Sequence, residues 1–293
     1  MSKNVLLTES RDIPLLHFLW KWKLSTTAAL IQKFFPDCKG KTAYTRLLAL
    51  RRGGFIRMSA DGLGQKFVCT LERKGFESIR ESLPLMQEVG FKSEHVGHDL
   101  LVSAFHLGEW LFEMPETATL YSEQQLRRIY PDLYPSWVPQ SDVHRPDGYT
   151  QALFKGRLTT FAIEVEISNK RDTDYLRIAE FYSHYRNIER VLWLVPRQST
   201  ARLIQRKMSE VQLDGPSPHD FILVGDFLKH GWHSQIELGP DKGKTLFSVL
   251  SGSSQEVHRK CTGHTLATTL LDTRKTPYFS AVYRGYQLGD FRD

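Results

Sequence analysis

Three acidic residues in the second half of the chain have the types and spacing for metal chemistry. Asp147 follows Pro146 at the start of one β-prone run, and Glu164 and Glu166 lie two apart in the next such run. Because side chains alternate along a strand, Glu164 and Glu166 share one face. Carboxylates converging from adjacent strands suit a hard divalent cation such as Mg²⁺. Such an ion activates water and stabilises the charge that develops on a phosphate.

The two β-prone runs must be neighbouring strands if these acids are to meet. A Lys155-Gly156 turn joins them, and apolar residues alternate strictly in the second run, at Phe161, Ile163, Val165 and Ile167. This pattern predicts a hairpin. Amphipathic and buried-looking segments surround it in the order helix, strands, helix, strand, helix, strand, which indicates an α/β sandwich around a mixed sheet. The predicted helices cover 98–114, 172–187 and 199–211, and the flanking strands lie within 118–131, 190–196 and 220–226.

The sequence PDG is followed, after about the length of a β-hairpin, by AIEVEIS and then NK. This arrangement resembles the PD-(D/E)xK nuclease core. The likeness includes the helix before the strands and the helix after the motif strand. The chain as a whole resembles the plasmid replication-relaxation family of prokaryotic mobile elements, over the N-terminal domain and residues 95–225. The resemblance implies that Asp147 and Glu164 are metal ligands, with Glu109 as an auxiliary acid. It implies Mg²⁺ or Mn²⁺ as the cofactor if the core is active, and none otherwise.

The chain departs from the nuclease motif at one position. Glu166 stands where the motif has its lysine, two residues after Glu164. We therefore hypothesise that Lys170 or Arg177 supplies the positive charge, and the candidate catalytic set is Asp147, Glu164, Glu166 and Lys170. The alternative for the three acids is a solvated strand edge, or salt bridges to Arg145, Lys155 and Arg171.

His95 and His98 are three residues apart, and Asp99 follows them. Residues at this spacing could bind a metal ion if all three side chains share one helix face. A lone HxxH pair without further ligands favours capping and packing instead.

Three helices and a hairpin are predicted in the first 80 residues. The first helix covers Ile13 to Trp20, the second begins after Ser25 or Thr26 and stops at Pro36, and the third ends at the glycine pair 53–54. Two β-prone runs follow, with turn residues Asp61, Gly62 and Gly64 between them. This order is typical of a winged helix-turn-helix domain, whose third helix enters the major groove.

Positive charge is concentrated in this first segment. Residues 1–80 contain 15 Lys and Arg against 6 Asp and Glu, although the whole chain carries only +6. A basic excess of this kind is expected in a segment that meets phosphates. The candidate DNA-binding residues are Lys39, Lys41, Thr42, Thr45, Arg46, Arg51, Arg52 and Lys66. The alternatives are a protein-binding winged helix and a solvated basic face without a partner.

The expected fold class is α/β, α+β overall, with a winged helix-turn-helix domain followed by a PD-(D/E)xK nuclease-like α/β/α sandwich. The domains are assigned as a winged helix over 1–80, a linker helix over 81–94, the nuclease-like domain over 95–240 and an irregular extension over 241–293. Cys38, Cys69 and Cys261 form no CxxC pair, and no apolar run approaches bilayer length. We expect reduced thiols, a cytoplasmic location and no membrane partner.

The functional expectation is a DNA-binding protein of a mobile element, acting in plasmid replication, mobilisation or its control. Its nuclease-like domain is either a Mg²⁺-dependent endonuclease or degenerate. The alternative is a non-enzymatic dimeric regulator of transcription or copy number. DNA is the expected partner, with a homodimer and replication or mobilisation proteins as further candidates. The chain has no Walker loop, no GxGxxG after a strand, no GxSxG and no HExxH.

Overall fold

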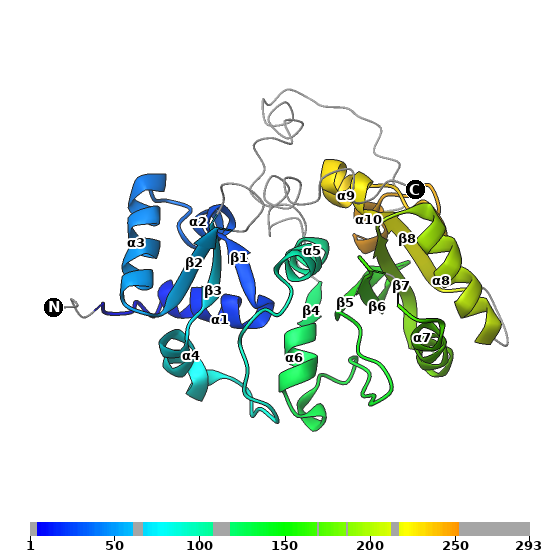
Figure 1. The fold of residues 1–293 in the computed structure, drawn as a ribbon, viewed down its shortest axis with the longest axis horizontal. Coiled ribbons are helices and arrows are strands. Elements are labelled where there is room, and N and C mark those ends of the chain that lie inside the picture. Colours follow the sequence, from blue (N-terminus) through cyan, green and yellow to red (C-terminus); the bar gives the residue numbers. More distant parts are fainter. Residues whose placement is uncertain are drawn as a thin grey trace.

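The computed structural model describes residues 5–60, 67–107, 118–168, 170–185, 187–211 and 217–251. Within these residues the chain forms a mixed α/β fold with two separate sheets and helices around them, as Figure 1 shows. The smaller sheet belongs to the N-terminal elements and the larger one to the elements after residue 118. The expectation of an α+β protein is confirmed at this level.

The N-terminal elements are α1 (Asp12–Trp22), β1 (Leu24–Thr26), α2 (Thr27–Phe34), α3 (Gly40–Arg52), β2 (Ile56–Ala60), β3 (Phe67–Leu71) and α4 (Arg73–Ile79). The hydroxyl of Thr26 accepts the Ala29 N–H at 3.2 Å, which satisfies a free donor at the start of α2. The three strands pair antiparallel in the order β1-β3-β2. The predicted helices and hairpin strands are confirmed, while the turn residues Asp61, Gly62 and Gly64 lie outside the described residues.

The larger sheet has the strand order β4-β5-β6-β7-β8. Its strands are β4 (Thr119–Ser122), β5 (Gly148–Phe154), β6 (Arg157–Val165), β7 (Ile188–Val195) and β8 (His219–Leu223). The first three pair antiparallel, and β6, β7 and β8 run parallel. The sheet is therefore mixed, as the sequence predicts. Lys155 and Gly156 form the turn between β5 and β6, both with positive φ, as a two-residue hairpin of type I′ requires.

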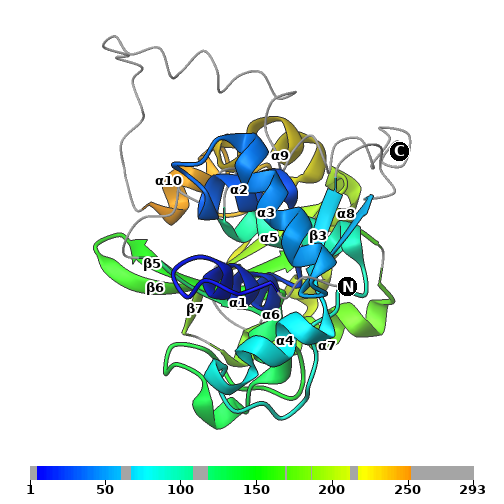
Figure 2. The same cartoon turned by 90° about the vertical axis from the view of Figure 1, so that its left-hand side faces the viewer.

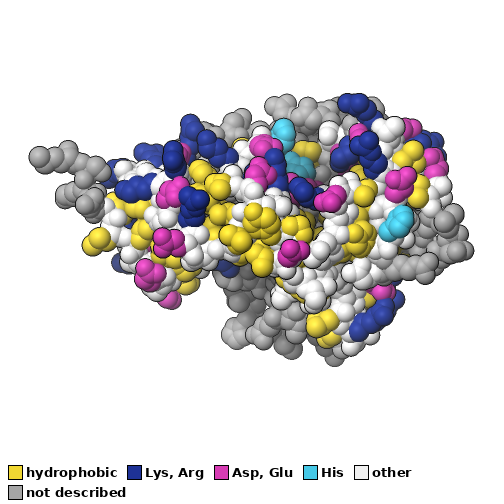
Figure 3. Space-filling model, turned by 90° about the horizontal axis from the view of Figure 1, so that it is seen from below, with side chains coloured by type: hydrophobic (Ala, Val, Ile, Leu, Met, Phe, Trp, Pro, Cys, Tyr) yellow, Lys and Arg dark blue, Asp and Glu magenta, His cyan; other side chains and the backbone are white. Residues whose placement is uncertain are grey.

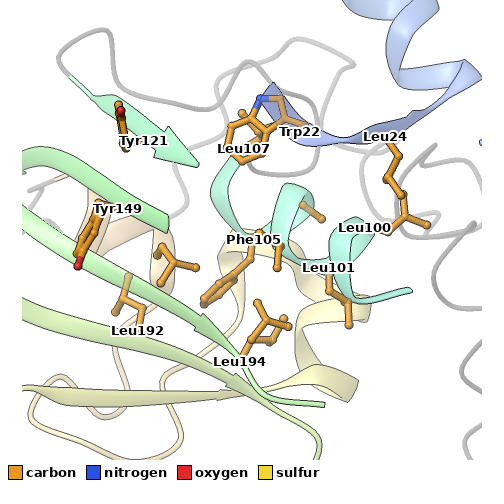
Figure 4. Packing of buried hydrophobic residues seen from close by; sticks show 14 of the residues in the cluster. Trp22, Leu24, Leu100, Leu101, Phe105, Leu107, Tyr121, Tyr149, Leu192 and Leu194 are labelled. Atoms are coloured by element: carbon orange, nitrogen blue, oxygen red, sulfur yellow. The ribbon is translucent and has the colours of Figure 1, made fainter. Parts of the chain in front are cut away.

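Helices cover both faces of this sheet, as Figure 1 shows. On one face lies α5 (Val96–Leu107), and on the other lie α7 (Asp172–His184) and α8 (Gln198–Val211). The central strand β6 is buried on both faces from Thr159 to Val165 for this reason. In Figure 4, Phe105 points from α5 toward the strand β7, which carries Leu192 and Leu194.

The N-terminal elements and the larger sheet share one hydrophobic core through α5. Trp22 and Leu24 lie against α5 on the side away from the sheet, near Leu107 and Leu100 (Figure 4). The rings of Trp22 and His106 are 5.2 Å apart. A polar contact also joins the N-terminal elements to the larger sheet: the Lys21 ammonium donates to the Leu120 carbonyl at 2.8 Å. Figure 2 shows α1 in front of the larger sheet.

Two segments differ from the domain assignment. Residues 83–95 contain no helix, and only the 3-10 turn Arg80–Ser82 extends α4. Pro84 explains this end, because a residue before proline is displaced from the helical conformation. In the segment assigned as irregular, α10 (Leu246–Leu250) buries Leu246, Val249 and Leu250 in the core. Residues 252–293 lie outside the described part.

The remaining short elements are α6 (Glu123–Arg128), the 3-10 turns Pro131–Leu133 and Gly231–His233, and α9 (Val224–His230). Among the described residues, no helix has both the length and the apolar character needed to span a bilayer. Cys38 is exposed and Cys69 is buried, and both are free thiols. On the face shown in Figure 3, Lys and Arg side chains lie mainly at the two ends, with a hydrophobic area between them.

Candidate functional site

Asp147 is fixed onto β6 by two contacts. Its backbone N–H donates to the Ile163 carbonyl at 3.0 Å, and its Oδ2 accepts the Val165 N–H at 2.7 Å. Gly148 must follow it, because φ there is +148° and an added Cβ would lie 2.5 Å from Nε2 of His106. In the sequence PDG, the glycine thus adopts a backbone conformation that residues with a side chain rarely adopt. This conformation allows Asp147, just before it, to lie beside β6.

Glu164 and Glu166 are buried at the end of β6, with 4% and 2% of their surface exposed. The backbone N–H of Glu166 donates to Leu194 at 2.9 Å, which keeps this residue beside β7 just after β6 ends. The two glutamates lie next to Asp147, whose neighbour Gly148 pairs with Ile163 in the sheet. Buried carboxylates are stable only with cationic or hydrogen-bonding partners, so their partners define the site.

Glu164 binds two side chains that sequence reasoning did not assign to the site. His144 Nε2 donates to Glu164 Oε1 at 2.6 Å, and the Tyr182 hydroxyl donates to the same oxygen at 2.5 Å. The pKa of Tyr182 is raised well above its ordinary value, first by burial and then by the negative charge of Glu164. Tyr182 lies on α7, and His144 stands three residues before Asp147.

Glu166 forms an ion pair with Lys170, and its Oε1 accepts the Ser168 N–H at 3.3 Å. Burial raises the pKa of Glu166, although Lys170 opposes this. Burial by itself would lower the pKa of Lys170, but Glu166, Glu164 and Asp147 together raise it. The Lys170 ammonium therefore pairs with Glu166, and the negative charges of Glu164 and Asp147 also favour its protonated form. Arg177 is exposed and has no polar partner in the described part of the chain.

His98 lies between two carboxylates at the start of α5. Its Nε2 donates to the Val165 carbonyl at 3.0 Å and is 3.5 Å from Asp147 Oδ1, while its Nδ1 is 3.6 Å from Asp99 Oδ1. Burial would lower the pKa of His98, but Asp147 and Asp99 raise it to about 11. Burial by itself would raise the pKa of Asp147, but His98, the Val165 N–H and Lys170 together lower it. The two carboxylates therefore favour the protonated form of His98, which HxxH spacing alone does not indicate.

The three acids have the oxygen chemistry that Mg²⁺ prefers, but as held they do not fit a metal site. Asp147 accepts the Val165 N–H and lies beside His98. Glu164 accepts hydrogen bonds from His144 and Tyr182. Glu166 forms an ion pair with Lys170. No group of three or more His, Cys, Asp or Glu side chains among the described residues is arranged to hold a metal ion. Glu109, the expected auxiliary acid, lies outside the described residues. The salt bridges considered to Arg145, Lys155 and Arg171 are not among the ion pairs of these three acids.

The exposed face of α3 is the second candidate site. This helix buries Ala43, Leu47 and Leu50, and its opposite side is open to solvent. The Thr45 hydroxyl donates to the Lys41 carbonyl at 2.8 Å. The predicted DNA-binding residues that are exposed are Lys39, Lys41, Thr42, Thr45, Arg51 and Arg52. Figure 2 shows α3 on the near side of the molecule.

One of the predicted DNA-binding residues, Arg46, is placed differently. Arg46 is partly buried, forms an ion pair with buried Asp12 and donates to the Leu6 carbonyl at 2.6 Å. Its guanidinium therefore fastens α3 to the start of α1. The pKa of Asp12 is lowered in return: burial would raise it, but the hydrogen bonds from Arg46 and Thr8 lower it. Lys66 lies outside the described residues.

Comparisons of the chain with protein-family models, curated proteins and solved structures give no match. The features of the chain that bear on its function are therefore the acidic residues at the end of β6 and the exposed face of α3.

Proposed function

We propose that the chain is a DNA-binding protein of the mobile-element type, acting in plasmid replication, mobilisation or its control. The observation that carries this proposal is the exposed face of α3. Lys41, Thr45 and Arg52 share one stripe of the helix, and the opposite stripe is buried. Cationic and hydroxyl side chains on one open helix face suit phosphate and base-edge contacts.

The N-terminal arrangement supports a winged helix-turn-helix assignment for this unit. Helix α1, strand β1, helices α2 and α3 and the β2–β3 hairpin follow one another, and β1 pairs with β3 beside the hairpin. In such domains the third helix contacts the major groove. Since winged helices also bind proteins, DNA affinity is the property to test.

Charge-neutral variants of α3 test the proposal. Lys41→Gln with Arg52→Gln removes two exposed cations without touching the core. The matched control is Arg202→Gln with Arg206→Gln, which removes two exposed cations from α8 at the other end of the molecule. In fluorescence anisotropy with duplex DNA, we expect the α3 variant to lose roughly tenfold or more in affinity and the α8 variant to match wild type. Equal affinities for the two variants would contradict DNA binding by α3.

The second half supports a nuclease-like arrangement as part of the same proposal. Helix α5, the antiparallel strands β4, β5 and β6, helix α7 and the parallel strand β7 follow the order of the PD-(D/E)xK core that the motif resembles. Winged helix and nuclease-like core together favour the plasmid replication-relaxation family as the functional class. Fold alone does not fix activity, so catalysis is a separate question.

A metal-dependent endonuclease is the second candidate function, and it requires the protein partners of Asp147 and Glu164 to give way to a cation. The pairing of Lys170 with Glu166 is the observation that favours it. The ammonium of Lys170 pairs with Glu166, so it supplies a positive charge beside the residue that replaces the lysine of the motif. The test is cleavage of supercoiled, linear and single-stranded DNA in Mg²⁺ and in Mn²⁺. An endonuclease cleaves, and Asp147→Asn, Glu164→Gln and Lys170→Met each abolish cleavage. Binding without cleavage on all substrates instead supports the non-enzymatic dimeric regulator.

A further inference from the structure

The hairpin of β5 and β6 extends beyond the rest of the larger sheet. Strand β4 pairs with β5 only from Gly148 to Gln151, and β7 pairs with β6 only from Thr160 onward. Among the described strands, residues 152–159 therefore pair only with each other. We call residues 152–159 the hairpin tip. In Figure 2 the hairpin reaches past the other described elements on the left.

The two faces of the hairpin tip differ, as the alternation of side chains along a strand allows. On one face Phe154 and Thr159 are buried, and the rings of Phe154 and Phe161 are 5.6 Å apart. On the other face Leu153 and Leu158 lie directly opposite each other, with 40% and 59% of their surface exposed. Neither leucine belongs to the hydrophobic core or packs against it. These two residues therefore form an exposed apolar pair that the fold itself does not use.

Positive charge flanks the leucine pair. Residues 151–160 contain Lys155 and Arg157 and no acid. Lys155 lies at the turn, with its ammonium 4.9 Å from the centre of the Phe154 ring. The Arg157 side chain is 67% exposed and pairs with Glu189 on β7. Exposed ion pairs are weak, and a guanidinium has five N–H donors, so Arg157 retains donors for a phosphate.

An apolar pair between two cations suits a partner that presents apolar surface beside negative charge. In DNA, stacked bases lie between phosphates, and minor-groove proteins insert apolar side chains, leucine among them, between base steps. A membrane surface fits less well, because binding there grows with the apolar area that is buried, and two leucines supply little. A second copy across a two-fold axis would bring the cations Lys155 and Arg157 of both copies together.

We propose that the hairpin tip is a second DNA-contacting element, in which Leu153 and Leu158 insert between base steps from the minor groove while Lys155 and Arg157 bind the flanking phosphates. Insertion of this kind kinks a duplex by about 20–90°. The inference rests on the proposed DNA-binding function. It adds bending of the DNA to the contacts that α3 makes.

DNA bending by the full chain tests the proposal. A short duplex with a donor and an acceptor dye at its two ends reports bending by energy transfer, and fluorescence anisotropy reports affinity. Leu153→Thr with Leu158→Thr removes the apolar pair and keeps residues that favour strands. Lys155→Asn with Arg157→Gln removes the two cations and keeps a residue that suits the turn.

The matched control is Leu85→Thr with Leu133→Thr. It removes two leucines that are 70% and 51% exposed and lie outside the hairpin. Circular dichroism and urea unfolding check the folding of every variant.

We expect the variant at Leu153 and Leu158 to bind DNA roughly tenfold more weakly than wild type and not to bend it. The variant at Lys155 and Arg157 should also lose affinity severalfold, and the control should match wild type. The proposal is overturned if wild type does not bend DNA, if the variant at Leu153 and Leu158 bends it as wild type does, or if the control loses as much.

Two further measurements separate the other partners of the hairpin tip. Sedimentation velocity detects self-association, and cosedimentation with phosphatidylserine vesicles detects lipid binding. If the variant at Leu153 and Leu158 loses either of these and still bends DNA, the tip contacts protein or lipid and the proposal fails. If only the α3 variant loses DNA affinity, the role of the hairpin fails and the proposed function stands. A wild-type chain without DNA affinity overturns both.

Discussion

The carboxylate of Asp147 accepts the backbone N–H of Val165 at 2.7 Å, one residue beyond Glu164. Asp147 thereby continues the β5–β6 ladder with its side chain, since its own N–H donates to Ile163 in the same strand. This contact gives Asp147 a structural role alongside any chemical one. Loss of function in a variant at this position is interpretable only when its folding is measured as well.

Asp147→Ala should lower the free energy of unfolding by about 1–3 kcal/mol, because the Val165 N–H loses its acceptor in a buried setting. Asp147→Asn keeps an acceptor for Val165 and should cost less. Urea unfolding at pH 7 measures both. Asp142→Ala is the control, an exposed acid five residues earlier that should stay within about 0.5 kcal/mol of wild type. Equal stabilities for Asp147→Ala and wild type would show that the contact with Val165 stabilises nothing.

Gly148→Ala should lower the free energy of unfolding by more than about 2 kcal/mol. The new methyl group meets Nε2 of His106 at 2.5 Å and the Tyr121 carbonyl at 2.7 Å, and φ of +148° is itself unfavourable for alanine. Gly225→Ala is the matched change inside a helix with nothing within 4 Å of the new atom. It should be neutral or stabilising by up to about 1 kcal/mol. Similar thermal shifts for the two variants would contradict the close packing at Gly148.

Much of the architecture could be predicted because it depends on the local periodicity of apolar residues and on the residues that begin and end helices. Alternation before Val165 predicted β6, Thr26 and Pro36 bounded α2, and Lys155-Gly156 marked the hairpin turn. The linker expected to be a helix is not helical after Ser82, because Leu83, which precedes Pro84, is extended. The way the N-terminal elements join the rest could not be predicted, because Trp22 meets α5 through a contact between distant segments with no local pattern.

The acidic residues of the site could be predicted from strand alternation, but their partners could not. His98 and Tyr182 reach Asp147 and Glu164 from α5 and α7, so their roles depend on how two helices cover opposite faces of the sheet. His144 stood beside the motif, yet nothing in its spacing showed that it turns toward Glu164. On α3, Lys41, Thr42, Thr45, Arg51 and Arg52 are exposed as predicted, whereas Arg46 is partly buried. Helical periodicity did not show that Arg46 binds Asp12.

His219 should make the protein less stable in acid. Its Nδ1 accepts the Trp193 indole N–H at 3.0 Å, and burial lowers its pKa to about 3. The unfolded chain takes up a proton near pH 6.5 and the folded chain does not, so stability falls as pH drops from about 6.5 toward 3. His219→Asn keeps an acceptor without this protonation. The difference in unfolding free energy between wild type and this variant should change by up to about 1.4 kcal/mol per pH unit in that range.

Exposed His95→Asn is the control for this titration, and its difference from wild type should stay nearly constant with pH. A constant difference for His219→Asn as well would show that buried His219 does not resist protonation.

The salt dependence of DNA affinity tests the central claim most directly. Lys39, Lys41, Arg51 and Arg52 are exposed on or beside α3, and each phosphate that such a cation neutralises contributes about −0.9 to the slope of log affinity against log salt. We predict a slope of about −3.6 on duplex DNA if all four make contact, which is roughly a hundredfold loss from 50 to 200 mM salt. Lys41→Gln with Arg52→Gln should make the slope shallower by about 1.8. An affinity that does not change with salt, or equal slopes for wild type and this variant, would contradict DNA binding through α3.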